Sequence, residues 1–339
     1  MRKGARFFLA LFLLFSFGSL WALDFDNGEI RLTLHERDGR FSLYQKPEYS
    51  NGAYEALFTD SDPRTSFLQV IVNDISYKLG DTSTFKIRIE ENSGNPAFVF
   101  ESPFLKVTEE FAFIKTAGVS YVNGLAITIT LANKSEKTFE AGARILIDTS
   151  LGEQGAGPDF VTDSYPIAAE TFIDAEKDRA FWISENDHLS LMGSISVVGI
   201  ERPSGIHFAN WKRLNEVSWK APYSAGRNFN APPYSIKDSA VCYYFDPRPL
   251  PGGQSCSFTF FLASGDKQGF LPQGQEKAKA PPDILDDERE KDLLQIRNLI
   301  NRIDVLMTEG NASGEEINAL EQTLNQLLAK YGSGSVNQR

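Results

Sequence analysis

The chain has 339 residues, and its 45 acidic side chains outnumber its 34 basic ones, which gives a formal net charge of −11. This acidic excess argues against nucleic acid or an anionic membrane surface as the main partner. The sequence contains no GxSxG, P-loop, HExxH or GxGxxG motif and no His-Cys cluster. It therefore gives no support for acyl transfer, nucleotide binding or zinc hydrolysis, and it predicts no metal and no cofactor.

Residues 1–22 have the layout of a cleaved secretory signal peptide. Arg2, Lys3 and Arg6 precede the apolar run FFLALFLLFSF, and small Ala22 comes just before an acidic segment. The run is too short to span a bilayer, and no later segment reaches the roughly 18 apolar residues that a span needs. We expect cleavage after Ala22 and a periplasmic or secreted protein with no membrane span in the mature chain.

Residues 23–265 are predicted to form one mainly β domain, a large antiparallel β-sandwich. Turn residues between alternating runs indicate two hairpins, at Asp38-Gly39 and at Asn73-Asp74. No helical periodicity interrupts the strand-like runs that follow. These runs are TFKIRIEE, PAFVFES, FLKVTEEFAFI, LAITITLAN, ARILIDT, AAETFI, RAFWIS, LMGSISVVGI, SAVCYYF and SCSFTFFL. Successive strands without intervening helices predict antiparallel sheets packed face to face.

The only two cysteines lie in the last two runs, which are joined by the turn-rich segment DPRPLPGG. If these runs pair as a hairpin with Phe245 near Gly253, Cys242 comes opposite Cys256. Because disulfides persist in exported proteins, a cross-strand disulfide is expected. The alternative is two free thiols in the core.

The composition changes after Gly265. Residues 266–284 have the Pro, Gly, Gln and Lys content of a linker, residues 285–331 are predicted to form a helical hairpin, and residues 332–339 a disordered tail. Ser313 and Glu316 fit a capping box for the second helix. Each helix carries one apolar stripe: Leu293, Ile296, Ile300, Ile303 and Met307 in the first, and Ile317, Leu320, Leu324, Leu327 and Tyr331 in the second.

Three alternatives are open for this hairpin. It can lie against the sandwich, remain a free and partly helical tail, or serve as a contact element. In the last case it pairs two copies as a four-helix bundle or receives a helix of an envelope protein.

A Gly-rich segment after one predicted strand collects acidic side chains, of which Asp148, Glu153 and Asp159 are the candidate site residues. Two carboxylates held about 5 to 9 Å apart can serve glycoside chemistry, and oxygen-rich loops can hold calcium. Acids in a loop are more often simply solvated, and that alternative ranks first.

The segment 207–235 is a long excursion rich in aromatic and hydrogen-bonding side chains. Its candidate ligand-binding residues are His207, Asn210, Trp211, Arg213, Trp219, Tyr223 and Arg227. Such a loop inside a compact domain is either functional or packed on its own side chains. Rings beside amides and charges can stack on sugars or meet a protein, whereas the alternative is that both tryptophans cap the core.

The runs AITITLANKSEKTFEAGARILIDTSLGE and FANWKRLNEVSW, with DSAVCYYFDPRPLPGGQS after them, resemble the strand and loop pattern of large secreted β-sandwich proteins. The resemblance is to the galactose-mutarotase-like super-sandwich architecture, over about residues 120–263. It implies the super-sandwich fold. Galactose mutarotases use a histidine acid and a glutamate base, but neither His188 nor His207 aligns with that histidine, so no catalytic residue is carried over.

Three functional hypotheses follow, in order of preference. The first is a non-catalytic exported protein that acts as a binding or scaffold component of an envelope assembly, with the helical hairpin as its protein contact. The second is glycan binding through residues 207–235, with Trp211 and Trp219 as stacking rings. The third is a carbohydrate-active enzyme, an epimerase or glycosidase, that uses Asp148, Glu153, Asp159 or His207.

Overall fold

The computed structural model describes residues 22–47, 50, 52–92, 94–153, 157–174, 179–234, 238–265 and 269–271. By its internal contacts the chain divides into two units, Met1–Gln275 and Glu276–Arg339, and the fold below is that of the first. The predicted helical hairpin at 285–331, the tail and the signal peptide up to residue 21 lie outside the described residues, as does most of the linker at 266–284. Within the described residues, no helix is long and apolar enough to cross a membrane.

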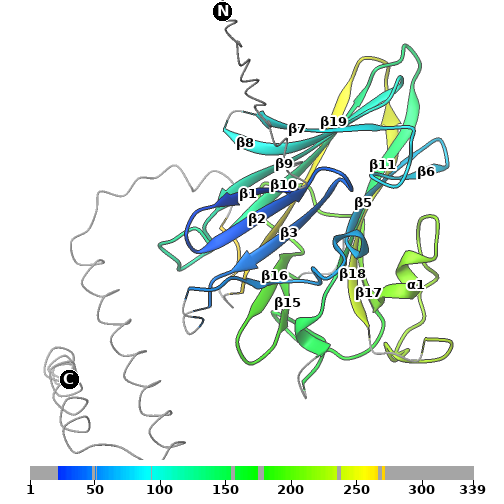
Figure 1. The fold of residues 1–339 in the computed structure, drawn as a ribbon. Coiled ribbons are helices and arrows are strands. Elements are labelled where there is room, and N and C mark those ends of the chain that lie inside the picture. The colour runs from blue at the N-terminus through cyan, green and yellow to red at the C-terminus, as the bar shows by residue number, and fades with distance from the viewer. Residues whose placement is uncertain are drawn as a thin grey trace, which may run out of the picture. The chain divides into compact units, whose positions relative to one another are not determined.

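The described residues form nineteen strands in three antiparallel sheets, so the prediction of a mainly β, antiparallel fold is confirmed (Figure 1). A four-stranded sheet consists of β1 (Leu23–Asp26), β2 (Ile30–His35), β3 (Arg40–Gln45) and β4 (Glu55–Ala56). A nine-stranded sheet has the order β13 (Pro166–Ile167), β12 (Phe160–Thr162), β15 (Phe181–Glu185), β16 (Ser190–Ser194), β19 (Ser255–Ser264), β10 (Gly124–Asn133), β9 (Leu105–Ile114), β8 (Asn95–Glu101) and β7 (Lys86–Asn92).

The third sheet is six-stranded, in the order β14 (Thr171–Asp174), β17 (Gly205–Asn210), β18 (Ser239–Leu250), β11 (Phe139–Asp148), β5 (Phe67–Val72) and β6 (Ile75–Lys78). The short helices of the described chain are η1 (Pro63–Thr65), η2 (Leu151–Glu153) and α1 (Trp211–Asn215). Helix α1 follows β17 directly and lies beside β17 and β18 (Figure 1).

Both predicted hairpins are present. Strands β2 and β3 pair across the turn that contains Gly39, whose φ of +60° suits glycine. Strands β5 and β6 pair around Asn73 and Asp74, whose φ angles of 46° and 67° are both left-handed. Two consecutive left-handed residues define the hairpin turn that Asn and Asp tolerate best, which explains why these turns were predictable.

The main core contains buried residues of all three sheets and is largely aromatic and aliphatic. Within it, the nine-stranded and six-stranded sheets form two facing layers. Ring pairs join the two layers: the centroids of Phe245 and Phe258 are 4.8 Å apart, and those of Tyr243 and Phe260 are 5.1 Å apart. Trp182, which is fully buried, donates from Nε1 to the Tyr243 hydroxyl at 2.6 Å. The contacts between layers therefore come from alternate residues of facing strands.

The predicted hairpin of the last two strands, and with it the disulfide, is wrong. Strand β18 belongs to the six-stranded sheet and β19 to the nine-stranded sheet, so the two strands face each other across the core instead of pairing. Cys242 pairs in register with Leu146 and His207 on the outer side of β18, whereas Cys256 lies opposite Leu131. Both cysteines are free.

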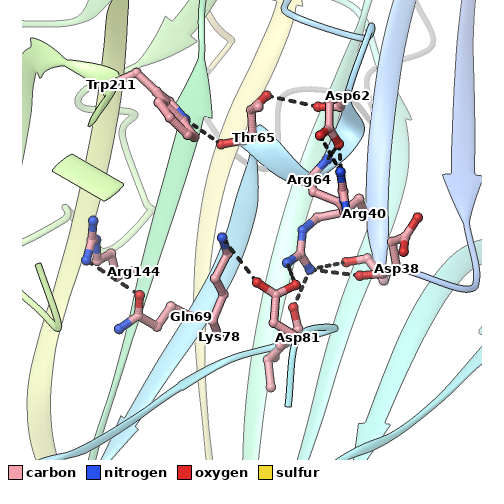
Figure 2. A network of polar contacts seen from close by, with 12 residues as sticks. Asp38, Arg40, Asp62, Arg64, Thr65, Gln69, Lys78, Asp81, Arg144 and Trp211 are labelled. Atoms are coloured by element: carbon pink, nitrogen blue, oxygen red, sulfur yellow. Dashed lines mark hydrogen bonds and ion pairs between the residues drawn. The ribbon is translucent and has the colours of Figure 1, made fainter. Parts of the chain in front are cut away.

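Arg40 connects the four-stranded sheet to the six-stranded one (Figure 2). Its guanidinium is buried and lies 2.8 Å from the carboxylate of Asp81, which follows β6 and also pairs with Lys78 at 3.2 Å. It also donates to the backbone carbonyls of Asp38 and Leu79. One cation thus satisfies acceptors from two sheets at their junction.

Candidate functional site

The outer face of the six-stranded sheet, turned away from the main core, carries two rows of side chains in register. One row runs Phe172, His207, Cys242, Leu146 and Phe67 across five strands. The other runs Gly205, Tyr244, Arg144, Gln69 and Lys78. Side chains opposite one another on neighbouring strands are within contact distance, so the sheet gathers residues that are far apart in the sequence.

The segment 211–234, named here the covering loop, packs on this face. Its Leu214 and Ala221 join a second apolar cluster with outer-face residues such as Cys242 and Tyr244. Asn210, at the end of β17, starts the loop by accepting hydrogen bonds from the amides of Lys212 and Arg213, which caps α1. The prediction of an excursion over 207–235 is wrong for residues 207–210, which complete strand β17, and the packed cover after them begins with one short helix.

Arg144 anchors the covering loop to the six-stranded sheet. Its guanidinium, fully buried, donates to the carbonyls of Val217, at 3.0 Å, and Leu214. It also lies 3.5 Å from the side-chain oxygen of Gln69 (Figure 2). The side-chain amide of Gln69 in turn donates to the Ser218 carbonyl. Backbone carbonyls that would otherwise be buried without a donor are satisfied in this way, so the loop has one defined path.

The structure places both tryptophans of the candidate set within this cover. Trp211 is partly buried, and its Nε1 donates to the Thr65 carbonyl at 2.8 Å (Figure 2). The ring of Trp219 is half-buried, with its centroid 6.3 Å from that of Tyr244. Asn210 and Arg227 also hold the loop, through the carbonyls of Phe229, at 2.8 Å, and of Ala231 and Pro232.

A buried charged network joins the sheet edge to the covering loop. Glu170, 2% exposed, lies 3.0 Å from Nε2 of fully buried His207 and 3.0 Å from Nε of Arg213. Burial lowers the pKa of His207, which Glu170 opposes by favouring the imidazolium. Both partners of this Glu-His pair are enclosed by the chain itself, which favours a structural role for them over proton transfer to a ligand.

Tyr223 is the most exposed aromatic side chain of the covering loop, with 52% of its surface accessible. Its ring centroid is 6.2 Å from that of Phe172, which is half-buried on β14, and 6.0 Å from that of His207. The exposed Tyr223 ring therefore packs against the rings of Phe172 and His207. The polar neighbours Arg213 and Ser224 are held by Glu170.

The acidic residues predicted as a second candidate site come together at the end of β11 and around η2. Glu153 accepts hydrogen bonds from the amide and the hydroxyl of Ser239, the latter at 2.9 Å. Burial raises the pKa of Asp148 to about 6 and that of Glu153 to about 7, and the charge of Asp238 adds to both increases. The backbone of Asp159 lies against Gly152, next to Glu153.

The residues of this acidic group are largely buried and hydrogen-bonded to neighbouring residues. The Asp148 backbone amide donates to the Ser66 hydroxyl at 2.9 Å, and Asp148 itself is 6% exposed. Among the residues with described positions, no group of three or more His, Cys, Asp or Glu side chains is arranged to hold a metal ion. Their raised pKa values make Asp148 and Glu153 sensitive to pH near neutrality.

Sequence reasoning found Tyr223, Arg213 and the acidic residues but missed Glu170, Arg144 and Phe172. Glu170 and Phe172 lie in the segment AAETFI, which was predicted only as a strand. Arg144 lies on the outer face of β11, because side chains alternate along a strand and its neighbours Ala143 and Ile145 both enter the main core. A charged residue at such a position was the one available signal that something covers this face.

No family model matches the chain, and no curated protein matches it. Among solved structures, the chain is similar to a galactose mutarotase related enzyme from Lactobacillus acidophilus, at 9% identity over 74% of this chain and 99% of that one, with a TM-score of 0.45. A galactose mutarotase-like protein from Lactobacillus casei matches at 10% identity over 72% of this chain and 100% of that one, with a TM-score of 0.42. A GalM/aldose epimerase homologue from C. elegans matches at 11% identity over 72% and 98%, with a TM-score of 0.44.

The likeness is distant. The galactose-mutarotase-like resemblance predicted from the sequence is thus found again among solved structures, as a distant likeness only. It gives no residue of this chain a role, because fold alone does not specify function.

Proposed function

We propose that the protein binds glycans through the outer surface of the covering loop, with Tyr223 as the main stacking ring and Phe172 beside it. The observation that carries the proposal is the exposure of Tyr223, 52%, on a loop whose backbone is held from below by buried side chains. An exposed aromatic ring on a fixed base loses little conformational freedom on binding, and this favours affinity.

The chemistry around Tyr223 suits a sugar. A tyrosine offers an apolar ring face to the C–H side of a pyranose and a hydroxyl at its edge. The same loop carries hydrogen-bonding side chains that are exposed or partly exposed, namely Lys212, Lys220, Arg227 and Asn228. Charged and amide groups beside a ring can bind the hydroxyls of a sugar whose apolar face is stacked.

This proposal changes the roles given to the two tryptophans by the sequence. Trp211 donates to the Thr65 carbonyl and Trp219 packs beside Tyr244, so we assign both to holding the loop. The stacking role passes to Tyr223. Trp219, half-buried in the same loop, then serves as a reporter, because its fluorescence responds to changes around it.

The experiment is a fluorescence titration of residues 23–339 with a broad panel of glycans, followed by calorimetry on any that bind. Tyr223→Ala is expected to weaken binding at least about tenfold, in line with the loss of a central aromatic contact. Tyr121→Ala is the matched control, because Tyr121 is also exposed, at 45%, but lies between two strands of the nine-stranded sheet. A panel without any binding glycan, or equal affinity of Tyr223→Ala and wild type, would contradict the proposal.

The role as an exported scaffold component of an envelope assembly remains a hypothesis drawn from the sequence alone. Its contact element, residues 285–331, lies outside the described residues, and the fold of the described part gives it no support. Export with cleavage after Ala22 is likewise a proposal, and the N-terminal sequence of the protein recovered from outside the cytoplasm tests it. Comparing the solution masses of residues 23–339 and 23–265 tests self-association through the C-terminal segment.

A further inference from the structure

Glu170 contacts the sheet and three separate points of the covering loop. Its Oε1 lies 3.0 Å from His207 Nε2 on β17 and accepts a hydrogen bond from the Ser224 amide at 2.8 Å. Its Oε2 forms the ion pair with Arg213. Its backbone amide donates to the Arg227 carbonyl at 2.7 Å.

These contacts lie on both sides of Tyr223 in the chain. Arg213, held by Glu170, donates from Nη2 to the carbonyl of Pro222, the residue before Tyr223. Ser224, the residue after it, donates its amide to Glu170 directly. The backbone on either side of Tyr223 is therefore held by Glu170, through Arg213 at Pro222 and through a direct hydrogen bond at Ser224.

The same contacts leave Glu170 committed to the protein. A carboxylate with 2% exposure is stable only if charge and hydrogen-bond partners compensate its burial, and Arg213, His207 and the Ser224 amide supply them. Both carboxylate oxygens face groups of the chain. The geometry thus suits a residue that acts through others and not one that touches a ligand.

We propose that Glu170 is the positioning residue of the glycan-binding surface, which it maintains by holding Pro222 and Ser224 and thereby fixing the direction of the Tyr223 ring. This inference rests on the proposed function, since it concerns the same surface. Without Glu170 the loop around Tyr223 keeps its other anchors, Arg144 and Asn210, but samples several conformations. Binding must then order the loop, which weakens affinity.

Glu170→Gln tests this, because the amide keeps the shape and one acceptor but loses the charge that binds Arg213. We expect glycan affinity to fall about tenfold and hydrogen exchange of the Ser224 amide to accelerate about tenfold. Glu216→Gln is the matched control, since Glu216 lies on the same loop but is 50% exposed, and both quantities should change less than twofold. Wild-type affinity and exchange in a folded Glu170→Gln protein would overturn the proposal.

Two further variants separate positioning from general stability. Ile173→Val shortens a buried side chain of β14, 1% exposed, and is expected to lower stability without changing affinity or Ser224 exchange. Arg213→Gln attacks the same ion pair from the more exposed partner and carries the test if Glu170→Gln does not fold. Its expected effects have the same direction, and Arg213→Lys, which retains the charge, should recover part of the lost affinity.

The exchange measurement needs no ligand, so the two proposals can fail separately. If no glycan binds the wild type but Ser224 exchange responds to Glu170→Gln, glycan binding is wrong while the role of Glu170 in ordering the loop holds. If a glycan binds and Tyr223→Ala abolishes it, but Glu170→Gln changes neither readout, the surface is correct and its positioning by Glu170 is wrong.

Discussion

The inner and outer faces of the six-stranded sheet are formed by alternate residues of the same strands, and both are covered. The inner face presents Tyr243 and Phe245 to the other sheet, in a core where contacts are mostly between rings and aliphatic chains. The outer face presents Arg144, His207 and other polar side chains to the covering loop. One covering is another sheet, and the other is irregular backbone.

The difference follows from what each covering must satisfy. A sheet that packs on a sheet has already paired its backbone groups, so the inner face needs only shape and apolar surface. A loop leaves its carbonyls and amides unpaired, and each needs a donor or acceptor when it is buried. We infer that the inner face sets the fold, while the outer face sets the conformation of the surface proposed to bind glycans.

The largest effect is expected at Gly193, on the inner side of β16. A Cβ atom built there would lie 2.3 Å from the Trp182 ring, which is fully buried and hydrogen-bonded to Tyr243. Gly193→Ala should lower the free energy of unfolding by about 3 kcal/mol or more, since overpacking in a dense core is not easily relieved. Denaturant unfolding measures this, with Gly157→Ala as control, because nothing lies within 4 Å of its added Cβ.

The next effect depends on pH and concerns Glu109, an acid on β9 that is 2% exposed inside the apolar core. Burial raises its pKa from the ordinary 4.5 to about 8, and Arg40 opposes the increase. The folded protein keeps this proton to higher pH than the unfolded chain, so stability is greatest below pH 4.5 and declines as the pH rises to about 8. Within this window the free energy of unfolding falls by about 1.4 kcal/mol for each pH unit.

Glu109→Gln should remove this decline, because the amide does not titrate. Unfolding free energies from pH 5 to 8 for the wild type and the variant measure it, and Glu140→Gln at an exposed position of β11 is the control. The same slope in Glu109→Gln as in the wild type would show that Glu109 does not hold its proton and that the core tolerates a charge.

A smaller and more local effect is expected from Arg144→Met. The change leaves the carbonyls of Leu214 and Val217 without their buried donor, and we expect a loss of about 2 kcal/mol. If the two faces have separate roles, amides of the covering loop should exchange faster while those of β10 keep their protection. Lys212→Met, at a side chain 61% exposed, should change neither quantity appreciably. Equal loosening of β10 would mean that the outer face also holds the core.

The strands and local hairpins were largely predictable from the sequence, whereas the network on the outer face of the six-stranded sheet was not. Alternation and turn residues predicted β2, β3, β5 and β6 with their pairing, because those signals lie within one hairpin. Alternation also predicted β18 and β19 but misled on their pairing. Two consecutive strands with apolar faces can pair side by side or face each other across the core, and only the whole sheet order decides which.

The outer network could not be found from local sequence. Glu170 is 37 residues from His207 and 54 from Ser224, and its own neighbours in the sequence show only a strand. A charged residue at a buried position indicates that a partner is present. Which residue is the partner depends on the path of the covering loop across the sheet, and local sequence does not specify that path. The candidate residues were therefore identified by type, whereas their roles as anchors or exposed ring required the structure.

The smallest effect is expected at Glu153, where the sequence had placed an acidic site. Burial, together with the charges of Asp238 and Asp148, raises its pKa from 4.5 to about 7, so its contribution to stability declines as the pH rises between those values. Glu153→Gln keeps an acceptor for the Ser239 amide and should flatten that part of the profile by less than Glu109→Gln does, because Glu153 is only partly buried and water screens it. Unfolding curves at pH 5, 6 and 7 measure the change. If the slope persists in Glu153→Gln and disappears in Asp148→Asn, the titrating proton belongs to Asp148, and the β11 end itself is the pH-sensitive part of the outer face.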